Sequence, residues 1–332
     1  MNDRTEPLRF GVLGAARIAP MALIQPARRV AGATVHAVAA RDVAKANAFA
    51  AKHGIPKVHA SYHTLLADPE IDAVYNPLPN GLHCEWTIQA LRAGKHVLCE
   101  KPIASNADEA QRMADAARET GRKLVEAFHW RYHPLAERVR TILASGALGA
   151  PRHYEAALAF PIGFLRNDIR WRFDLAGGAM MDVGCYTVSM LRHTAGAEPE
   201  VQSANALLWS PQVDRRMEAR LRFADGRTGA LLCSMWSRTL IKASLRVECE
   251  RGELRVFNPI GPHVYNRLTV RGPNGTQKER VGGEATYTCQ LRAFVDHVRN
   301  GAPVPTGPDD AVANMRVIDA VYRAAGLKPR AT

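Results

Sequence analysis

The chain has 332 residues, a length that favours two domains at roughly 100–200 residues each. Hydrophobic residues make up 47% of the sequence and charged residues 23%, an ordinary globular composition that excludes disordered and fibrous proteins. The formal net charge is +12, but Lys and Arg are spread along the chain without a basic run interleaved with aromatic residues. We therefore expect no nucleic-acid partner.

The cysteines and the hydropathy pattern bear on the cellular compartment. The six cysteines form no CxxC pair and mostly lie in apolar runs, which is typical of reduced thiols in a cytoplasmic protein. No apolar stretch approaches the roughly 18 residues that a membrane span requires, and residues 1–9 are polar, unlike a secretory signal. We expect a soluble cytoplasmic protein without a membrane partner.

Short apolar runs alternate with amphipathic segments over the first part of the chain. The apolar runs predict buried strands at Leu8–Leu13, Val35–Ala40, Ile71–Tyr75, His96–Glu100 and Lys123–Phe128. The segments between them predict helices at Arg17–Ala31, Val43–Lys52, Cys84–Ala93 and Ala107–Thr120. This alternation is typical of a parallel sheet covered by helices on both faces. It predicts an α/β, doubly wound domain over residues 1–128.

The pattern changes after Phe128. Strands are predicted at Arg152–Phe160, Met217–Phe223, Thr228–Trp236, Ala243–Glu250, Gly252–Phe257 and Val264–Val270. Helices are predicted at Pro134–Ser145, Gly177–Thr194, Gln290–Asn300 and Asp309–Ala325. Short turns between most of the strands favour antiparallel pairing. Residues 129–332 are therefore predicted to form an α+β domain.

A loop of small residues joins the first predicted strand to the first helix. It stands where the dinucleotide fingerprint G-x-G-x-x-G/A should stand, and a helix start there suits a pyrophosphate. The candidate phosphate-binding positions are Gly14, Ala15, Ala16, Arg17 and Ile18. Ala16 departs from the usual second glycine and adds a methyl group near the phosphates. A plain strand-to-helix turn is the alternative interpretation.

Arg41 and Asp42 follow the second predicted strand. An NAD site would place a carboxylate there to bond the ribose 2′-hydroxyl, whereas a guanidinium fits a 2′-phosphate. Asp42 could bond the ribose or cap the helix that begins at Val43. We favour NADP as the cofactor, and NAD stays open.

Two further loops lie at the carboxyl ends of strands, the edge of a parallel sheet where ligands gather. The candidate cofactor contacts in these loops are Pro77, Leu78, Asn80, His83, Glu100 and Lys101. A partly desolvated Lys101 beside a nicotinamide ring could donate or accept a proton. An ordinary surface lysine is the alternative.

Asp182 and Tyr186 are four residues apart at the start of a predicted helix and therefore share one helical face. A tyrosine phenol beside a cationic lysine is a credible proton shuttle. An amphipathic helix with an ordinary polar flank is the alternative interpretation.

The order of these motifs along the chain resembles that in the Gfo/Idh/MocA oxidoreductase family. The motifs are the Gly14 loop, the segment Asn76 to His83, Glu100-Lys101-Pro102 and the segment Gly177 to Tyr186. Tyr186, where many members carry His, is similar to the branch with dihydrodiol dehydrogenase, xylose dehydrogenase and deoxysugar ketoreductases. The resemblance covers nearly the whole chain.

The resemblance implies an NAD(P)-binding Rossmann domain and a second domain with an open, mostly antiparallel sheet that often forms the subunit interface. A homodimer or homotetramer through that sheet is therefore expected. By the same similarity Lys101 is the catalytic lysine, Asp182 and Tyr186 lie on the substrate-facing helix, and the Lys101–Pro102 bond is cis.

Several residues outside these motifs are candidate substrate contacts. Trp130 and Arg131 lie in a segment similar to one near the family's substrate pocket, and Arg166 and Trp171 precede the Gly177 turn. Packing and surface roles are the alternative for all four. No metal site is expected, because the pair His129 and His133 lacks a third ligand.

These observations predict an NADP(H)-dependent oxidoreductase that transfers hydride to or from a carbinol or ketone carbon of a sugar-like or cyclic diol substrate. Lys101, Tyr186 and Asp182 would be its catalytic residues. One alternative keeps this fold but acts on a nucleotide-linked ketosugar. The other is a non-catalytic NADP-binding sensor.

Overall fold

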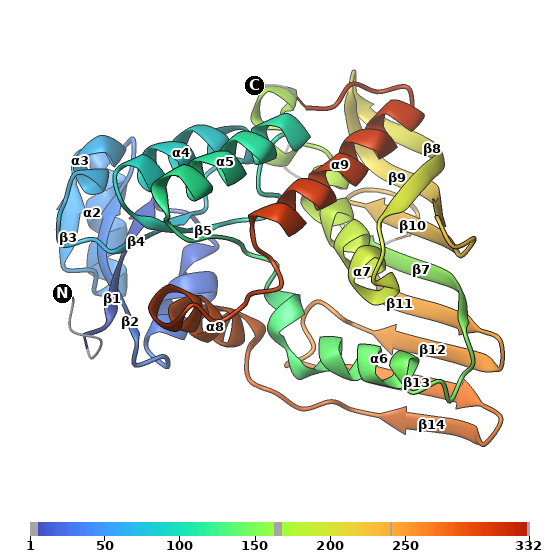
Figure 1. Ribbon diagram of the computed structural model, residues 1–332. Coiled ribbons are helices and arrows are strands. Elements are labelled where there is room, and N and C mark those ends of the chain that lie inside the picture. Colours follow the sequence, from blue (N-terminus) through green and yellow to red (C-terminus); the bar gives the residue numbers. More distant parts are fainter. Residues whose placement is uncertain (1–5, 163–167, 240, 331–332) are drawn as a thin grey trace. The chain divides into compact units, whose positions relative to one another are not determined.

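The computed structural model describes residues 6–162, 168–239 and 241–330, and the chain divides into two compact units (Figure 1). Unit 1 comprises Met1–Ala104, Asp108–Tyr132 and Tyr287–Val312. Unit 2 comprises Ser105–Ala107, His133–Thr286 and Ala313–Thr332. The sequence predicts a division near residue 128, and nothing in it indicates that the segment Tyr287–Val312 returns to unit 1.

Unit 1 is built on a six-stranded sheet with the order β3-β2-β1-β4-β5-β6, and each neighbouring pair is parallel. Its strands are β1 (Leu8–Leu13), β2 (Ala33–Ala39), β3 (Lys57–His59), β4 (Ala73–Asn76), β5 (His96–Cys99) and β6 (Leu124–Glu126). The order reverses direction between β1 and β4, which makes this a doubly wound Rossmann sheet with a ligand-binding crevice expected at that point. The predicted α/β class is confirmed.

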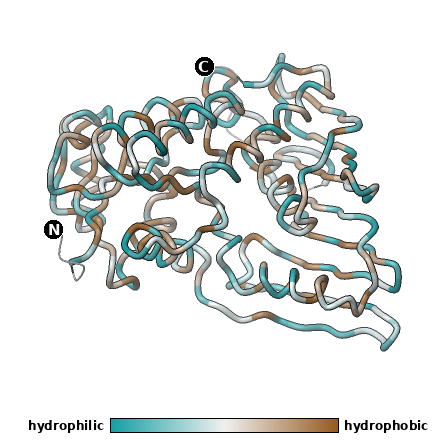
Figure 2. The backbone as a smooth tube through the Cα atoms, in the orientation of Figure 1, coloured by the Kyte–Doolittle hydropathy of each residue, from teal (hydrophilic) through white to brown (hydrophobic). Residues whose placement is uncertain are grey.

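The helices of unit 1 connect these strands. They are η1 (Pro20–Ile24, a π-helical turn) running into α1 (Gln25–Ala27), α2 (Val43–His53), α3 (Tyr62–Leu66), η2 (Asn80–Leu82), α4 (His83–Arg92), α5 (Ala107–Thr120), η3 (His129–Tyr132) and α8 (Thr286–Asn300). Figure 2 shows hydrophobic residues recurring between hydrophilic ones along α4 and α5, as expected for helices with one buried face. The last helix, α9 (Pro308–Ala324), begins in unit 1 and continues in unit 2.

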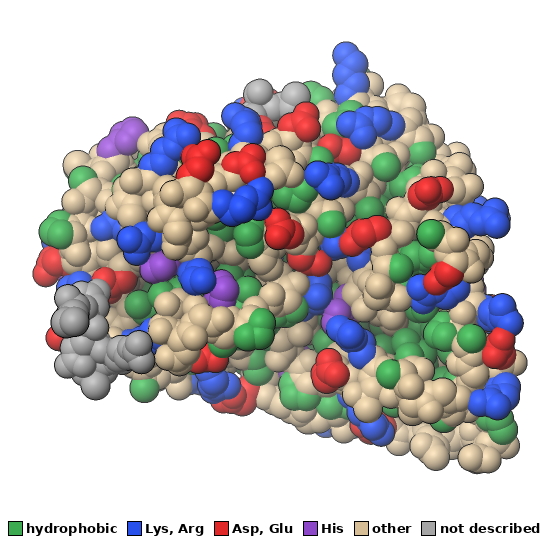
Figure 3. Space-filling view, in the orientation of Figure 1, with side chains coloured by type: hydrophobic (Ala, Val, Ile, Leu, Met, Phe, Trp, Pro, Cys, Tyr) green, Lys and Arg blue, Asp and Glu red, His purple; other side chains and the backbone are tan. Residues whose placement is uncertain are grey.

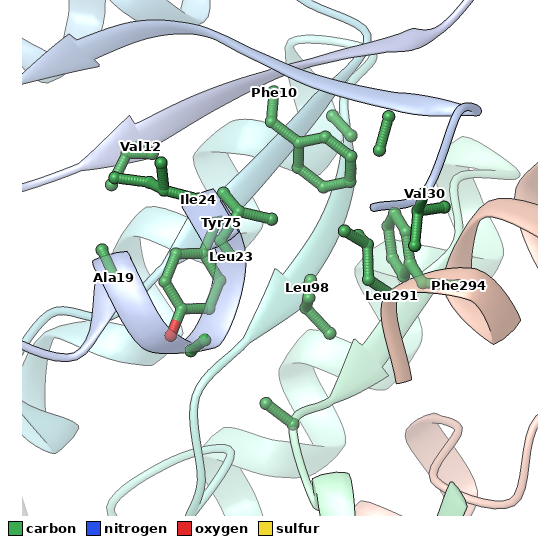
Figure 4. Close-up of a cluster of buried hydrophobic side chains, with 14 of the residues drawn as sticks. Phe10, Val12, Ala19, Leu23, Ile24, Val30, Tyr75, Leu98, Leu291 and Phe294 are labelled. Carbon is green, nitrogen blue, oxygen red and sulfur yellow. The ribbon is translucent and has the colours of Figure 1, made fainter. Parts of the chain in front are cut away.

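The core of unit 1 explains why the α8 segment belongs to it. Phe10 of β1 packs against Phe294 of α8 with ring centroids 5.6 Å apart, and Leu291 joins the same buried cluster (Figure 4). Fully burying a side chain of this size contributes about 1.5–3 kcal/mol. The helix therefore covers a face of the sheet that the first 128 residues leave unfilled.

Unit 2 contains an eight-stranded sheet with the order β14-β13-β12-β11-β7-β10-β9-β8. Its strands are β7 (Pro151–Ala159), β8 (Pro199–Ser210), β9 (Val213–Phe223), β10 (Thr228–Ser234), β11 (Lys242–Cys249), β12 (Gly252–Phe257), β13 (Arg267–Gly272) and β14 (Gly275–Glu279). The β7–β10 pair is parallel, and the other pairs are antiparallel. The mostly antiparallel sheet is confirmed, and β8 and β14 are strands that the sequence did not reveal.

Apart from α9, the helices of unit 2 precede β7 or lie between β7 and β8 in the chain. They are α6 (Pro134–Ala144), η4 (Ile169–Trp171), η5 (Phe173–Leu175) and η6 (Met180–Gly184, a π-helical turn) running into α7 (Cys185–Ala195). Most residues of α7 are buried, and the helix packs against β7 and β10. A helix buried nearly all round holds its few polar side chains in fixed places.

Charged side chains of both signs lie on the face of the molecule seen in Figure 3. Figure 3 shows Lys and Arg interspersed with Asp and Glu on the visible face, so the net positive charge is distributed over that face. Within the residues that the structure describes, no helix is long and apolar enough to cross a membrane.

Candidate active site

The loop after β1 makes a tight turn into the η1–α1 helix. Gly14 has φ +90°, a left-handed conformation that favours glycine, and its N–H donates to the carbonyl of Ala39 at 2.6 Å. A β-carbon at Gly14 would lie 3.3 Å from Leu78 Cδ2, so this loop approaches the one after β4. Ala15, Ala16 and Ile18 are half-buried, and Arg17 is exposed. A tight turn into a helix start is the kind of place where backbone N–H groups can bind a phosphate.

Two charged residues, Arg41 and Asp42, follow the carboxyl end of β2, and their surroundings differ. Asp42 caps α2 by accepting from the Lys45 N–H at 3.1 Å, and this hydrogen bond lowers the pKa of the Asp42 carboxyl. Arg41, one residue earlier, is exposed. Of the two roles that the sequence left open for Asp42, the structure shows helix capping.

The loop after β4 is fixed by the buried Asn76. Its Oδ1 accepts from the Leu78 N–H at 3.3 Å, and its Nδ2 donates to Thr87 Oγ1 at 3.1 Å. Leu78 is buried, while Pro77 and Asn80 are half-buried. A side chain that bonds its own backbone two residues on is a common way to stabilise such a turn.

His83 links this loop to the one after β5. Its ring is fully buried, with Nε2 2.7 Å from the carbonyl oxygen of Leu78 and Nδ1 2.9 Å from that of Pro102. Burial lowers the pKa of His83 to about 4, although both carbonyls oppose that shift. A neutral imidazole has one N–H, so one carbonyl accepts it and the other faces a ring lone pair. His83 thus joins two ligand-facing loops from within the unit.

Lys101 follows β5 and is held through the residue before it. Glu100 is 8% exposed; its Oε1 accepts from the Tyr75 hydroxyl at 2.7 Å and its Oε2 from the Lys101 N–H at 3.3 Å. Burial, followed by the Glu100 charge, raises the pKa of Tyr75, which keeps the phenol a donor. The Lys101–Pro102 bond is cis, and the Lys101 side chain is half-buried.

A second carboxylate supports the other side of this loop. Glu126, at the end of β6, accepts from the Ile103 N–H at 2.8 Å and is 1% exposed. The segment that carries Lys101 is therefore tied to neighbouring strands on both sides, and its backbone is ordered before any ligand binds.

In unit 2, the predicted helix begins with the η6 turn, and its Asp182 is held by an arginine. Arg170 Nε donates to Asp182 Oδ2 at 3.1 Å, while Nη1 donates to both oxygens of Asp168 at 3.1 Å. The Asp182 side chain is 18% exposed, and Tyr186 is 7% exposed. The four-residue spacing places Asp182 and Tyr186 on successive turns of one helix.

The other predicted substrate contacts have varied surroundings. Trp171 is 5% exposed and stacks on Trp209 of β8 with centroids 4.6 Å apart. In unit 1, Trp130 is 3% exposed, and Arg131 pairs with Asp310 at 3.3 Å. Arg166 lies outside the described residues. Substrate contact by Trp130, Arg131, Arg166 and Trp171 stays a prediction.

Tyr75 and Arg170 are among the residues of these arrangements that sequence reasoning missed. Tyr75 lies in a predicted strand, where an aromatic residue looks like core, and only the acidic residue at the next strand end hints at a partner. Arg170 stands between Arg166 and Arg172, and nothing in the sequence distinguishes it from them. Across the described ranges, no group of three or more His, Cys, Asp or Glu could hold a metal ion.

Comparison with known families matches both parts of the chain. Residues 8–128 match the model described as an oxidoreductase family with an NAD-binding Rossmann fold. Residues 136–255 match the GFO/IDH/MocA C-terminal domain.

Individual relatives cover almost the full length. A D-xylose 1-dehydrogenase (NADP(+)) from Haloferax volcanii is 37% identical over 321 residues, 96% of this chain and 97% of the relative. A dTDP-3,4-didehydro-2,6-dideoxy-α-D-glucose 3-reductase from Streptomyces violaceoruber is 33% identical and covers 98% of each chain. The crystal structure of a 3-ketoreductase from Actinomadura kijaniata in complex with NADP and TDP-benzene has a TM-score of 0.89 at 29% identity, covering 96% of this chain and 98% of that one. The chain therefore belongs to the Gfo/Idh/MocA oxidoreductase family.

Proposed function

We propose that this protein is an NADP(H)-dependent oxidoreductase that interconverts a carbinol and a ketone carbon on a sugar-like or cyclic diol substrate. The observation that carries the proposal is the lysine at the carboxyl end of β5. Lys101 stands where ligands bind to a doubly wound sheet, and the buried Glu100 and Tyr75 hold its backbone. A surface lysine needs no such support.

The residues at this edge fit NADP. Gly14 makes the tight turn that the pyrophosphate requires, and the following η1–α1 helix start supplies backbone N–H groups. Arg41 would bind the 2′-phosphate through its guanidinium fork. Asp42, the carboxylate that could favour NAD, is engaged in capping α2. The relative from Haloferax volcanii is named as an NADP(+) enzyme, which agrees with this assignment.

The protein's own residues would orient the substrate and move its proton. The bound nicotinamide supplies or accepts the hydride. Lys101 and Tyr186 would protonate the forming alkoxide, or remove the alcohol proton in the other direction. Asp182, oriented by Arg170, would accept a hydrogen bond from a neighbouring substrate hydroxyl.

The substrate class follows from the proposed proton carriers and from the names of relatives. A carboxylate four residues before a phenol on one helix suits a polyhydroxylated ring, and the relatives are named for D-xylose and for a dTDP-linked deoxyketosugar. A free sugar or cyclic diol is our main proposal. A nucleotide-linked ketosugar is the second candidate, since the net charge of +12 would attract its phosphates.

The decisive assay follows NADPH oxidation with ketosugars and NADP reduction with free sugars and cyclic diols. We expect turnover with at least one substrate, and Lys101→Met should abolish it while NADPH binding stays intact. Lys52→Met, which changes an exposed lysine on α2, is the matched control. An active Lys101→Met variant would refute the role of Lys101. Tight NADPH binding without turnover on any substrate would favour the non-catalytic sensor.

We further propose that the protein is cytoplasmic and forms a homodimer or homotetramer through the sheet of unit 2. Exposed and half-buried side chains alternate with buried ones along β9 and β12, so each strand has one side outside the unit core. Sedimentation velocity tests the assembly, and a monomer at micromolar concentration would contradict it.

A further inference from the structure

A fully buried ion pair lies in unit 2, away from the residues of the proposed reaction in sequence. Arg330 Nη2 donates to Asp214 Oδ1 at 2.9 Å, and both side chains are 0% exposed. The Tyr322 hydroxyl donates to the same oxygen at 2.9 Å, and the Arg330 guanidinium lies 4.1 Å from the Tyr322 ring centroid. Arginine is rarely buried so completely, and here a carboxylate and an aromatic ring both contact its charged group.

Arg330 Nη1 also donates to the carbonyl of Lys328 at 3.4 Å, and two further hydrogen bonds of this pair go to one short turn. Arg330 Nε donates to the carbonyl of Gly177 at 2.7 Å, and Asp214 Oδ2 accepts from the Met180 N–H at 2.7 Å. The turn from Gly177 to Met180 is therefore held by a cation at its carbonyl and by an anion at its N–H. Hydrogen bonds to charged groups are shorter and stronger than neutral ones.

The pair also explains why this turn contains glycine. Gly178 has φ +132°, and a β-carbon there would overlap the carboxylate of Asp214 and the guanidinium of Arg330. The Gly178 carbonyl in turn accepts from the Asp182 N–H at 3.0 Å. Gly178 thus contacts the buried charges on one side and bonds Asp182, a residue of the proposed reaction, on the other.

The burial of these charges is not needed for stability alone. Replacing a buried ion pair by well-packed apolar groups is often neutral or stabilising, because desolvation offsets the attraction. What an apolar replacement cannot do is bond a carbonyl and an N–H of the same turn at fixed positions. The directional contacts, rather than the buried area, are what this pair supplies.

We propose that Arg330, Asp214 and Tyr322 are positioning residues that hold the Gly177–Met180 turn and so set the start of the helix that carries Asp182 and Tyr186. The catalytic consequence rests on the proposed function. The structural part does not, because it concerns the order of the turn itself.

Amide hydrogen exchange of the intact protein tests the structural part. In Arg330→Met, protection of the amides from Met180 to Tyr186 should fall by about ten- to a hundredfold, as expected when a hydrogen bond to a charged group is lost. Tyr322→Phe keeps the ring and should give a smaller loss in the same peptide. Arg323→Met, which alters a mostly exposed arginine of α9, is the control and should leave that peptide unchanged. Unchanged protection in Arg330→Met and Tyr322→Phe would overturn the proposal.

Steady-state kinetics on the same variants tests the catalytic consequence. Per folded molecule, kcat for the sugar should fall by about tenfold or more in Arg330→Met, while the Kd for NADPH, which binds to unit 1, stays unchanged. A lower melting temperature with unaltered kcat would show a merely structural role and overturn the positioning claim. If the wild-type protein turns over no substrate, the proposed function fails, and the exchange result still decides whether the pair holds the turn.

Discussion

Replacing Arg41 by Ala removes the guanidinium at the end of β2, where we propose that it binds the 2′-phosphate of NADP. The neighbouring Asp42 stays engaged with Lys45 at the start of α2, so the variant gains no free carboxylate for the ribose. We therefore expect weaker NADPH binding, with little change for NADH.

The size of the loss follows from the position of Arg41. A hydrogen-bonded contact between charged groups contributes about 1.5–3 kcal/mol. Arg41 is exposed, so solvent and salt screen it and the lower value applies. A loss of about 1.5 kcal/mol corresponds to a roughly tenfold higher Kd for NADPH, and the loss should shrink at high ionic strength.

Fluorescence titration of both coenzymes at two salt concentrations measures this change. Asp42→Ala is the control: it should lower stability through the lost cap of α2, without altering the coenzyme preference. An equal loss for NADPH and NADH in Arg41→Ala, or no loss for either, would refute the assignment of Arg41.

Three other variants test the supports of the site. Tyr75→Phe leaves the buried Glu100 without its phenol donor. It should lower the free energy of unfolding, measured in urea, by about 1.5–3 kcal/mol, and it should also lower kcat. If neither quantity changes, the role given to this hydrogen bond is wrong. Burial lowers the pKa of His83 to about 4, so as the pH falls the unfolded chain binds a proton at His83 before the folded protein does. The contribution of His83 to the free energy of unfolding should therefore be complete above about pH 6.5 and be lost as the pH falls towards 4. His83→Gln should remove up to about 3 kcal/mol of that pH-dependent loss in urea titrations, and an unchanged slope would show that His83 does not titrate in this way. Arg170→Lys should lower kcat about tenfold with an unchanged Kd for NADPH, because a lysine cannot bridge Asp182 and Asp168 in the same fork geometry. Arg172→Lys, which changes an exposed arginine, is the control and should leave kcat unchanged. Equal kcat values for the two variants would argue against the bridge.

The sequence predicted unit 1 well where strands are apolar runs and missed its shortest elements. The predicted limits of β1 and α5 agree with the structure, because an apolar run and a long amphipathic period are strong local signals. β3 has three half-buried residues, too few for a pattern. The return of α8 to the sheet was beyond sequence reasoning, since an apolar helix face does not indicate which core it joins.

The strands of unit 2 show a different limit. β8 was missed because its burial does not alternate and several large hydrophobic residues, such as Leu207 and Trp209, are exposed on it. An edge strand with one partner is free to break the two-residue period that reveals a strand. The inner strands β9 and β12 keep that period and were predicted.

The candidate site divides in the same way. Motif residues such as Gly14 and Lys101 could be proposed as site residues because their positions after strand ends are readable in the sequence. The supporting residues Tyr75, Arg170 and Arg330 were not, because their partners come from other segments of the chain. A buried arginine near residue 330 reads as a surface residue until the fold brings Asp214 to it.

We propose that Lys101 and Tyr186 act on one substrate oxygen. A crystal structure of the protein with NADP and a substrate sugar measures this directly. We expect Lys101 Nζ and the Tyr186 hydroxyl each within about 3.2 Å of the oxygen on the reacting carbon. A complex in which either group lies beyond hydrogen-bonding reach of that oxygen, with the sugar in place, would show that the two residues do not share the proton transfer.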